Sequence, residues 1–114
     1  PLVKVTASVQ EMFSEITAKH TGAVSIVDDA GKLVGLVTDY DIRRAVGEGQ
    51  NIFKMTIREI MNPNPIRVNV DEKAIQALKI MEEREKPLAV LPVVDSGAIV
   101  RGMIHLHDLI DKGL

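Results

Sequence analysis

The sequence predicts a mixed α/β (α+β) fold of two similar halves related by a pseudo-twofold axis, each a small β-sheet with two packed α-helices. The main observation is an internal repeat, in which residues 33–44 are matched by residues 100–111, 67 positions later. In both copies a Gly lies inside an apolar run and an Asp follows it, Gly35 before Asp41 and Gly102 before Asp108. The second observation is size. A chain of 114 residues with 46% hydrophobic residues suits one domain, whose halves would each be marginal alone and should therefore pack on one another.

The elements of the first half follow from periodicity and from turn residues. Alternation over residues 3–5 predicts a short strand, and two β-branched runs at 23–27 and 33–37, separated by an Asp-Asp-Ala-Gly turn, predict a hairpin. A helix is expected over residues 38–46, where two glycines follow. Helical spacing predicts an earlier helix with an apolar stripe of Val9, Met12, Phe13 and Ile16.

The second half repeats this order of elements. A strand at residues 68–70 and a hairpin over 90–94 and 99–104 match their counterparts at offsets of 65 and 67 positions. The change of offset predicts a connection two residues longer after the intervening helix, whose apolar stripe is Ala74, Ala77, Leu78 and Met81. We therefore expect a first motif at residues 1–50, a linker with a helical turn at 51–61, and a second motif at 62–114.

Composition excludes several functions. The net charge is −2 and the basic residues are scattered, which argues against a nucleic-acid partner. No apolar run is long enough to span a membrane, and the absence of Cys excludes disulfides and thiolate metal sites, so we expect a cytoplasmic protein. His105 and His107 beside Asp108 lack a clear third metal ligand, so no metal site is predicted. No catalytic triad or Gly-rich phosphate loop is evident from the spacing.

The start of the last helix in each half has two interpretations. Thr38 and Asp41 have the spacing of a capping box, in which the Asp completes the helix N-terminus without any ligand. Alternatively, the helix N-terminus binds a phosphate and the carboxylate accepts hydrogen bonds from ribose hydroxyls. In the second copy His105 replaces the Thr while Asp108 is retained, which favours a ligand role.

The halves resemble two CBS motifs forming a tandem pair, or Bateman module. The resemblance is carried by residues 60–65, residues 89–95 and the two Gly-x-x-(Thr/His)-x-x-Asp segments. It implies that the Thr and Asp hold the ribose and phosphate of a nucleotide in a cleft between the motifs. Thr38 and Asp41 match this pattern fully, whereas the second copy matches only at Asp108. Pro92, whose counterpart is Ser25, would then lie near the base.

A narrower resemblance is to the C-terminal CBS pair of arabinose 5-phosphate isomerases, with Tyr40 in place of the usual Gly between the two aspartates. These enzymes also carry a sugar-isomerase (SIS) domain and make a precursor of Kdo for lipopolysaccharide. The resemblance implies a non-catalytic regulatory piece whose SIS domain lies outside these 114 residues. The expected effector is an adenosine nucleotide such as AMP, or the nucleotide sugar CMP-Kdo.

The charged candidates for contact with the effector's phosphate or carboxylate are Arg43, Arg44, Lys86, His105 and His107. For the two histidines the alternative is that strand alternation points them to opposite sides, with one facing solvent. For the whole chain the alternative is a structural oligomerisation module, forming homodimers through CBS-pair contacts without a physiological ligand.

Overall fold

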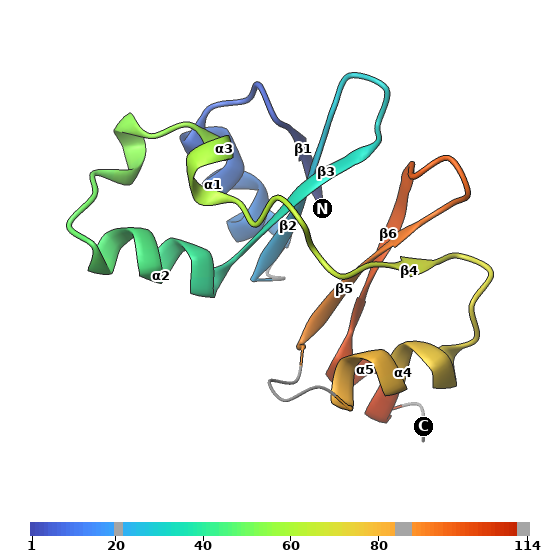
Figure 1. The fold of residues 1–114 in the computed structure, drawn as a ribbon. Coiled ribbons are helices and arrows are strands. Elements are labelled where there is room, and N and C mark those ends of the chain that lie inside the picture. The colour runs from blue at the N-terminus through green and yellow to red at the C-terminus, as the bar shows by residue number, and fades with distance from the viewer. Residues whose placement is uncertain (20–21, 84–87, 112–114) are drawn as a thin grey trace. The chain divides into compact units, whose positions relative to one another are not determined.

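The computed structural model describes residues 1–19, 22–83 and 88–111 (Figure 1). It confirms a mixed α/β fold with two small three-stranded sheets, of order β1-β2-β3 and β4-β5-β6. The chain divides into two compact units, Pro1–Pro65 and Ile66–Leu114. Each unit is described by itself below.

The first unit begins with β1 (Leu2–Lys4), α1 (Val9–Lys19), β2 (Ala23–Val27), β3 (Leu33–Thr38) and α2 (Asp39–Gly47). Strand β1 pairs parallel to β2, and β2 pairs antiparallel to β3 in the predicted hairpin. A short 3-10 helix, η1 (Ile52–Lys54), and α3 (Ile57–Ile60) follow. These last two elements lie in the segment expected to be a linker.

The second unit contains β4 (Val68–Asn69), α4 (Ala74–Glu82), β5 (Val90–Val94), β6 (Val100–His105) and α5 (Leu106–Asp111). Its pairing repeats that of the first unit, with β4 parallel to β5 and β5 antiparallel to β6. Even the irregularity of register recurs, between Ile26 and Val27 in β2 and between Val93 and Val94 in β5. The internal repeat of the sequence is therefore a repeat of structure.

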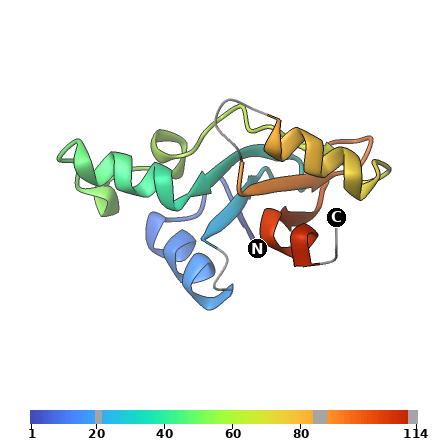
Figure 2. The same cartoon turned by 90° about the horizontal axis from the view of Figure 1, so that it is seen from below.

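The core of the first unit lies between its sheet, α1 and α3, and Figure 2 shows α1 beside the strands. It is made of Val9, Met12, Ile16, Val24, Ile26, Val37, Ile57, Ile60 and Met61. The stripe predicted for the first helix is confirmed, with Phe13 packed at its margin. Three core side chains come from α3 and the residue after it, so the expected linker contributes to the packing of this unit.

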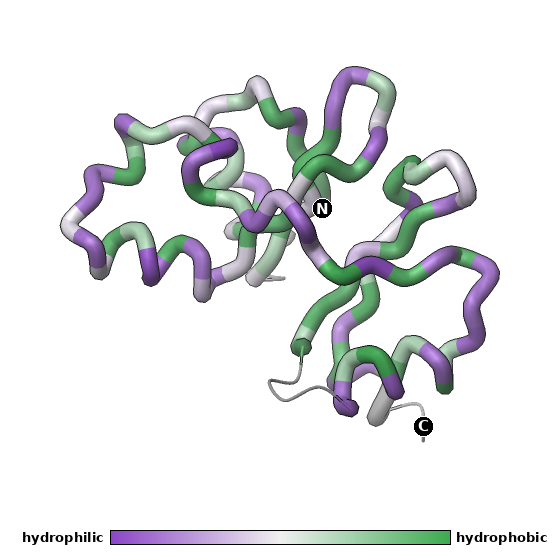
Figure 3. Tube along the Cα trace, viewed as in Figure 1, coloured by the Kyte–Doolittle hydropathy of each residue, from purple (hydrophilic) through white to green (hydrophobic). Residues whose placement is uncertain are grey.

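The core of the second unit is smaller and consists of Val68, Ala77, Leu78, Met81 and Leu91. Its stripe was predicted one residue too long, because Ala74 is exposed together with the rest of the first turn of α4. In the hydropathy view of Figure 3 the strands are largely apolar, and the β2–β3 turn is hydrophilic.

The two hairpin turns use the same chemistry. Asp28 Oδ1 accepts hydrogen bonds from the backbone N–H groups of Ala30 and Lys32, each at 2.9 Å. Asp95 Oδ1 accepts the equivalent bonds in the second unit, at 2.9 and 3.1 Å. The left-handed residue of each turn is Gly31 (φ 86°) in the first unit but Ala98 (φ 66°) in the second.

Candidate functional site

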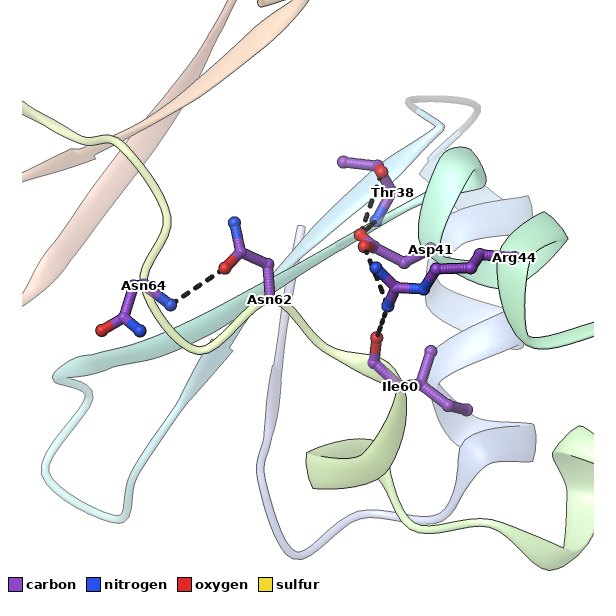
Figure 4. A network of polar contacts seen from close by, with 6 residues as sticks. All are labelled: Thr38, Asp41, Arg44, Ile60, Asn62 and Asn64. Atoms are coloured by element: carbon purple, nitrogen blue, oxygen red, sulfur yellow. Dashed lines mark hydrogen bonds and ion pairs between the residues drawn. The ribbon is translucent and has the colours of Figure 1, made fainter. Parts of the chain in front are cut away.

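The start of α2 is organised around the buried carboxylate of Asp41, which is only 5% exposed. Its Oδ2 accepts hydrogen bonds from the backbone N–H of Thr38 at 2.8 Å and from the Thr38 hydroxyl at 3.0 Å (Figure 4). Within residues 38–47 the hydroxyl accepts no cap hydrogen bond from the helix in return. The Asp half of the expected capping box is thus present, and it occupies one carboxylate oxygen.

Arg44 connects this helix start to the end of α3. One guanidinium nitrogen lies 3.6 Å from Asp41 Oδ1 and donates to the carbonyl of Ile60 over 3.4 Å (Figure 4). The guanidinium also lies over the ring of Tyr40, 5.8 Å from its centroid. Arg43, the neighbouring candidate, is exposed. The structure therefore brings Thr38, Asp41 and Arg44 together and leaves Arg43 outside this network.

The residue after Met61 takes part in the same region, although the sequence did not single it out as a site residue. Asn62 pairs with Leu36 on the outer edge of β3 through backbone bonds of 3.0 and 2.9 Å. Its side-chain oxygen accepts the backbone N–H of Asn64 at 3.0 Å. The sequence signal for this approach is Gly35, because a Gly inside a strand often marks a place where another backbone comes close.

The start of α5 has different contacts. Asp108 is 56% exposed at its side chain, and its two oxygens face His107 Nε2 at 3.0 Å and His105 Nδ1 at 3.9 Å. The two imidazole rings lie 6.0 Å apart. One histidine does face solvent, as the alternative expected, because the His107 side chain is 74% exposed and that of His105 only 18%. Strand alternation is not the cause, since the strand ends at His105 and α5 begins at Leu106. The structure thus groups three of the predicted residues of the second unit, His105, His107 and Asp108.

Two buried polar atoms in the described part of the chain have no hydrogen-bond partner. They are Ser25 Oγ in β2 and His105 Nε2 at the end of β6, one in each unit. Ser25 is the repeat counterpart of Pro92, which is buried in β5 opposite Met103. Lys86, the remaining predicted contact, lies outside the described residues.

Neither a metal centre nor a membrane span is found in the ranges that the structure describes. No three His, Asp or Glu side chains there are grouped to hold a metal ion. The helices of those ranges are also too short or too polar to cross a bilayer.

Comparison with known families decides what this arrangement is. The CBS domain family matches residues 1–48 and again residues 57–114. The chain belongs to the CBS domain family. The two matches correspond to the two copies of the repeat, so the chain is a CBS pair, and the segment between them includes η1.

The CBS pair is similar to part of a longer enzyme. It is 34% identical over 114 residues to arabinose 5-phosphate isomerase KdsD of Escherichia coli K12, covering 100% of this chain and 34% of that protein. The same values hold for KdsD of Pseudomonas aeruginosa. The chain spans about a third of the length of these relatives.

Solved structures support the same fold. A CBS domain pair of protein MJ0100, in complex with 5′-methylthioadenosine and S-adenosyl-L-methionine, has a TM-score of 0.82 and 29% identity over 99% of this chain and 88% of that one. The structure of CBSX2 in complex with AMP has a TM-score of 0.83, covering 99% of this chain and 86% of that one. Its sequence identity is 24%, so it supports the fold alone.

Proposed function

We propose that this CBS pair is the effector-sensing regulatory part of an arabinose 5-phosphate isomerase, that its effector is a nucleotide or nucleotide sugar, and that the pair itself is not catalytic. The observation that carries the proposal is the pair of unsatisfied buried atoms, Ser25 Oγ and His105 Nε2. Leaving a buried polar group unpaired costs about 1–3 kcal/mol, so such atoms are usually satisfied by a ligand or by water.

Both atoms fall at positions that the family resemblance assigns to ligand contact. Ser25 is the counterpart of Pro92, the position expected near the base, and His105 is the counterpart of Thr38. A Ser hydroxyl both donates and accepts, which suits the polar edge of a base. An imidazole nitrogen suits a phosphate or a carboxylate oxygen.

The remaining contacts of the proposal follow the chemistry of each unit. Asp41 accepts ribose hydroxyls through Oδ1, because Oδ2 already accepts two hydrogen bonds from Thr38, whereas the Arg44 guanidinium lies 3.6 Å from Oδ1. Exposed Arg43 supplies positive charge for a phosphate. In the second unit, Asp108, whose Oδ1 lies 3.0 Å from His107 Nε2, offers its exposed carboxylate to hydroxyl groups of the ligand.

The two candidate effectors are an adenosine nucleotide and CMP-Kdo. The adenosine case is supported by the 29% identical CBS pair that holds 5′-methylthioadenosine and S-adenosyl-L-methionine. The CMP-Kdo case is supported by the replacement of Thr38 by His105 in the second copy, because the Kdo carboxylate is an additional anionic group.

The test is calorimetric titration and thermal unfolding with AMP, S-adenosyl-L-methionine and CMP-Kdo. A ligand of the folded state must raise the melting temperature. Ser25→Ala should weaken binding about tenfold, the effect of about 1.4 kcal/mol, while leaving the free protein as stable or slightly more stable. Ser14→Ala, on the exposed face of α1, is the matched control.

The alternative function gives a different result. If the module only joins two copies into a homodimer, no nucleotide raises the melting temperature, and the dimer persists in sedimentation without ligand. Unchanged affinity in Ser25→Ala would also contradict the role proposed for that hydroxyl.

A further inference from the structure

Arg44 ties the start of α2 to the end of α3 in the first unit. One guanidinium nitrogen lies 3.6 Å from Asp41 Oδ1 and donates to the Ile60 carbonyl over 3.4 Å (Figure 4). The guanidinium also lies over the ring of Tyr40, 5.8 Å from its centroid. Arg44 therefore connects the oxygen proposed to accept the ribose with a helix that supplies two core side chains, Ile57 and Ile60.

The polar contacts of Arg44 are weak ones. An N–H···O hydrogen bond in proteins is usually about 2.9–3.0 Å long, so a bond of 3.4 Å to a neutral carbonyl is a long one. A hydrogen bond from Arg to a phosphate is charge-assisted, often bidentate and about twice as strong as a neutral one. The Arg44 side chain is 43% exposed, so solvent lies beside it and it can change partner. A phosphate within reach should therefore take the guanidinium from the carbonyl.

The Ile60 carbonyl depends on this hydrogen bond. It belongs to the last turn of α3, where helix carbonyls have no partner within the helix. No backbone N–H in the described part of the chain donates to it. The next residue is held by the backbone alone, since the Met61 N–H donates to the Ile57 carbonyl at 2.9 Å. Loss of the Arg44 bond should therefore loosen the end of α3 without detaching it from the core.

We propose that Arg44 has two positions, bound to the Ile60 carbonyl in the free protein and to the phosphate of the effector in the complex. A ribose held at Asp41 Oδ1 brings its phosphate close to the guanidinium, because that oxygen already lies 3.6 Å from Arg44. Binding then loosens the end of α3, and this helix responds to the occupancy of the site. The inference rests on the proposed function, from which it takes the nucleotide at Asp41.

This coupling must act in both directions. If the effector loosens α3, a change that loosens α3 must strengthen effector binding by the same factor. The other end of α3 offers such a change. Thr56 Oγ1 accepts the N–H of Glu59 at 3.3 Å, and Glu59 Oε1 accepts the N–H of Thr56 at 3.0 Å. Thr56 is exposed, so replacing it removes a helix cap and disturbs no core packing.

The first experiment measures the affinity of Thr56→Ala for AMP and for CMP-Kdo by calorimetric titration. The affinity should rise about two- to fivefold, where fivefold corresponds to about 1 kcal/mol, the usual effect of one cap. Ser8→Ala is the matched control, because Ser8 Oγ accepts the N–H of Glu11 at 3.1 Å at the start of α1. It should lose similar stability in urea unfolding and keep its affinity. An affinity that falls or stays the same in Thr56→Ala overturns the proposal.

The second experiment follows amide hydrogen exchange at Met61. Saturating AMP or CMP-Kdo should speed this exchange about five- to tenfold, whereas a ligand that only stabilises the fold would slow it. Adenosine and cytidine, which lack the phosphate, should not speed it. Arg44→Met has no side-chain donor, so it should exchange fast without nucleotide and show no further increase. The Asp28 amide, which donates to the Lys32 carbonyl in the β2–β3 turn, is the control and should show no increase.

The outcomes separate this inference from the proposed function. Nucleotide binding with slower or unchanged exchange at Met61 overturns the two-position role of Arg44 and leaves the proposed function intact. Wild-type exchange at Met61 in free Arg44→Met overturns it without any ligand. If neither AMP nor CMP-Kdo binds the wild-type protein, the proposed function is wrong and this inference fails with it.

Discussion

Replacing Asp41 tests how much the network at the start of α2 contributes to folding. Asp41→Ala removes the acceptor of two hydrogen bonds from Thr38, at 2.8 and 3.0 Å, and the ionic partner of Arg44. Leaving the partly buried N–H and hydroxyl of Thr38 without this acceptor costs about 2 kcal/mol, within the range of about 1–3 kcal/mol for a buried donor that loses its partner. The ion pair adds little, because the Arg44 side chain is 43% exposed.

The expected loss is therefore about 2 kcal/mol of unfolding free energy. For a domain slightly above 100 residues this corresponds to a fall in melting temperature of about 8 °C. Urea unfolding followed by circular dichroism measures the free energy, and calorimetry measures the melting temperature. Asp41→Asn keeps an oxygen that can accept from Thr38, so it should lose about half as much.

Asp108→Ala is the matched control in the second copy. Its carboxylate is 56% exposed and faces only His105 and His107 in the described residues, so the expected loss is below about 0.5 kcal/mol. Equal losses for Asp41→Ala and Asp108→Ala would refute the reasoning. If Asp41→Asn preserves stability but weakens nucleotide binding, the carboxylate contacts the ribose as well as capping the helix.

Three further predictions concern stability. Ala98→Gly should raise the free energy of unfolding by about 0.5–1 kcal/mol, because Ala98 is held at φ 66° in the left-handed region. Gly31→Ala in the equivalent turn should lower the free energy of unfolding, because Gly31 has φ 86°. Urea unfolding measures both changes. Ile60→Ala should cost about 3 kcal/mol in the same assay, because this side chain is fully buried; a cost below 1 kcal/mol would mean that α3 is not part of the core. Burial raises the pKa of Asp95, but hydrogen bonds from Arg101 and two backbone N–H groups outweigh this, so the pKa is lowered from 3.8. Its stabilising effect is present above the unfolded-state pKa and is lost as pH falls through the folded one, so Asp95→Asn should flatten the acid side of a pH–stability curve.

The order of elements was predictable from the sequence because it depends on local patterns. The stripe of Val9, Met12 and Ile16 has helical spacing, and each of these residues is buried in the structure. The error at Ala74 has a simple cause. Periodicity gives the face of a helix but not how far its first turn extends beyond the sheet that covers it.

Contacts between distant residues could not be predicted in this way. The bond between Arg44 and the Ile60 carbonyl depends on where α3 packs, and no local pattern contains that information. Gly35 did carry a signal, but Gly102 carries the same one while its surroundings are open in the described structure. Identical sequence signals therefore have different environments in the two copies.

The comparison of the two aspartates bears on what the repeat is for. If helix capping alone accounted for the Asp, its backbone bond should recur wherever the Asp recurs. Asp41 accepts the N–H of Thr38, but within the described residues Asp108 accepts no such bond from His105 and instead faces two imidazoles. Capping thus accounts for the first carboxylate and not for the second. The stability of α5 does not explain an exposed carboxylate between two histidines beside the unsatisfied Nε2 of His105, and this supports the ligand role proposed above for these residues.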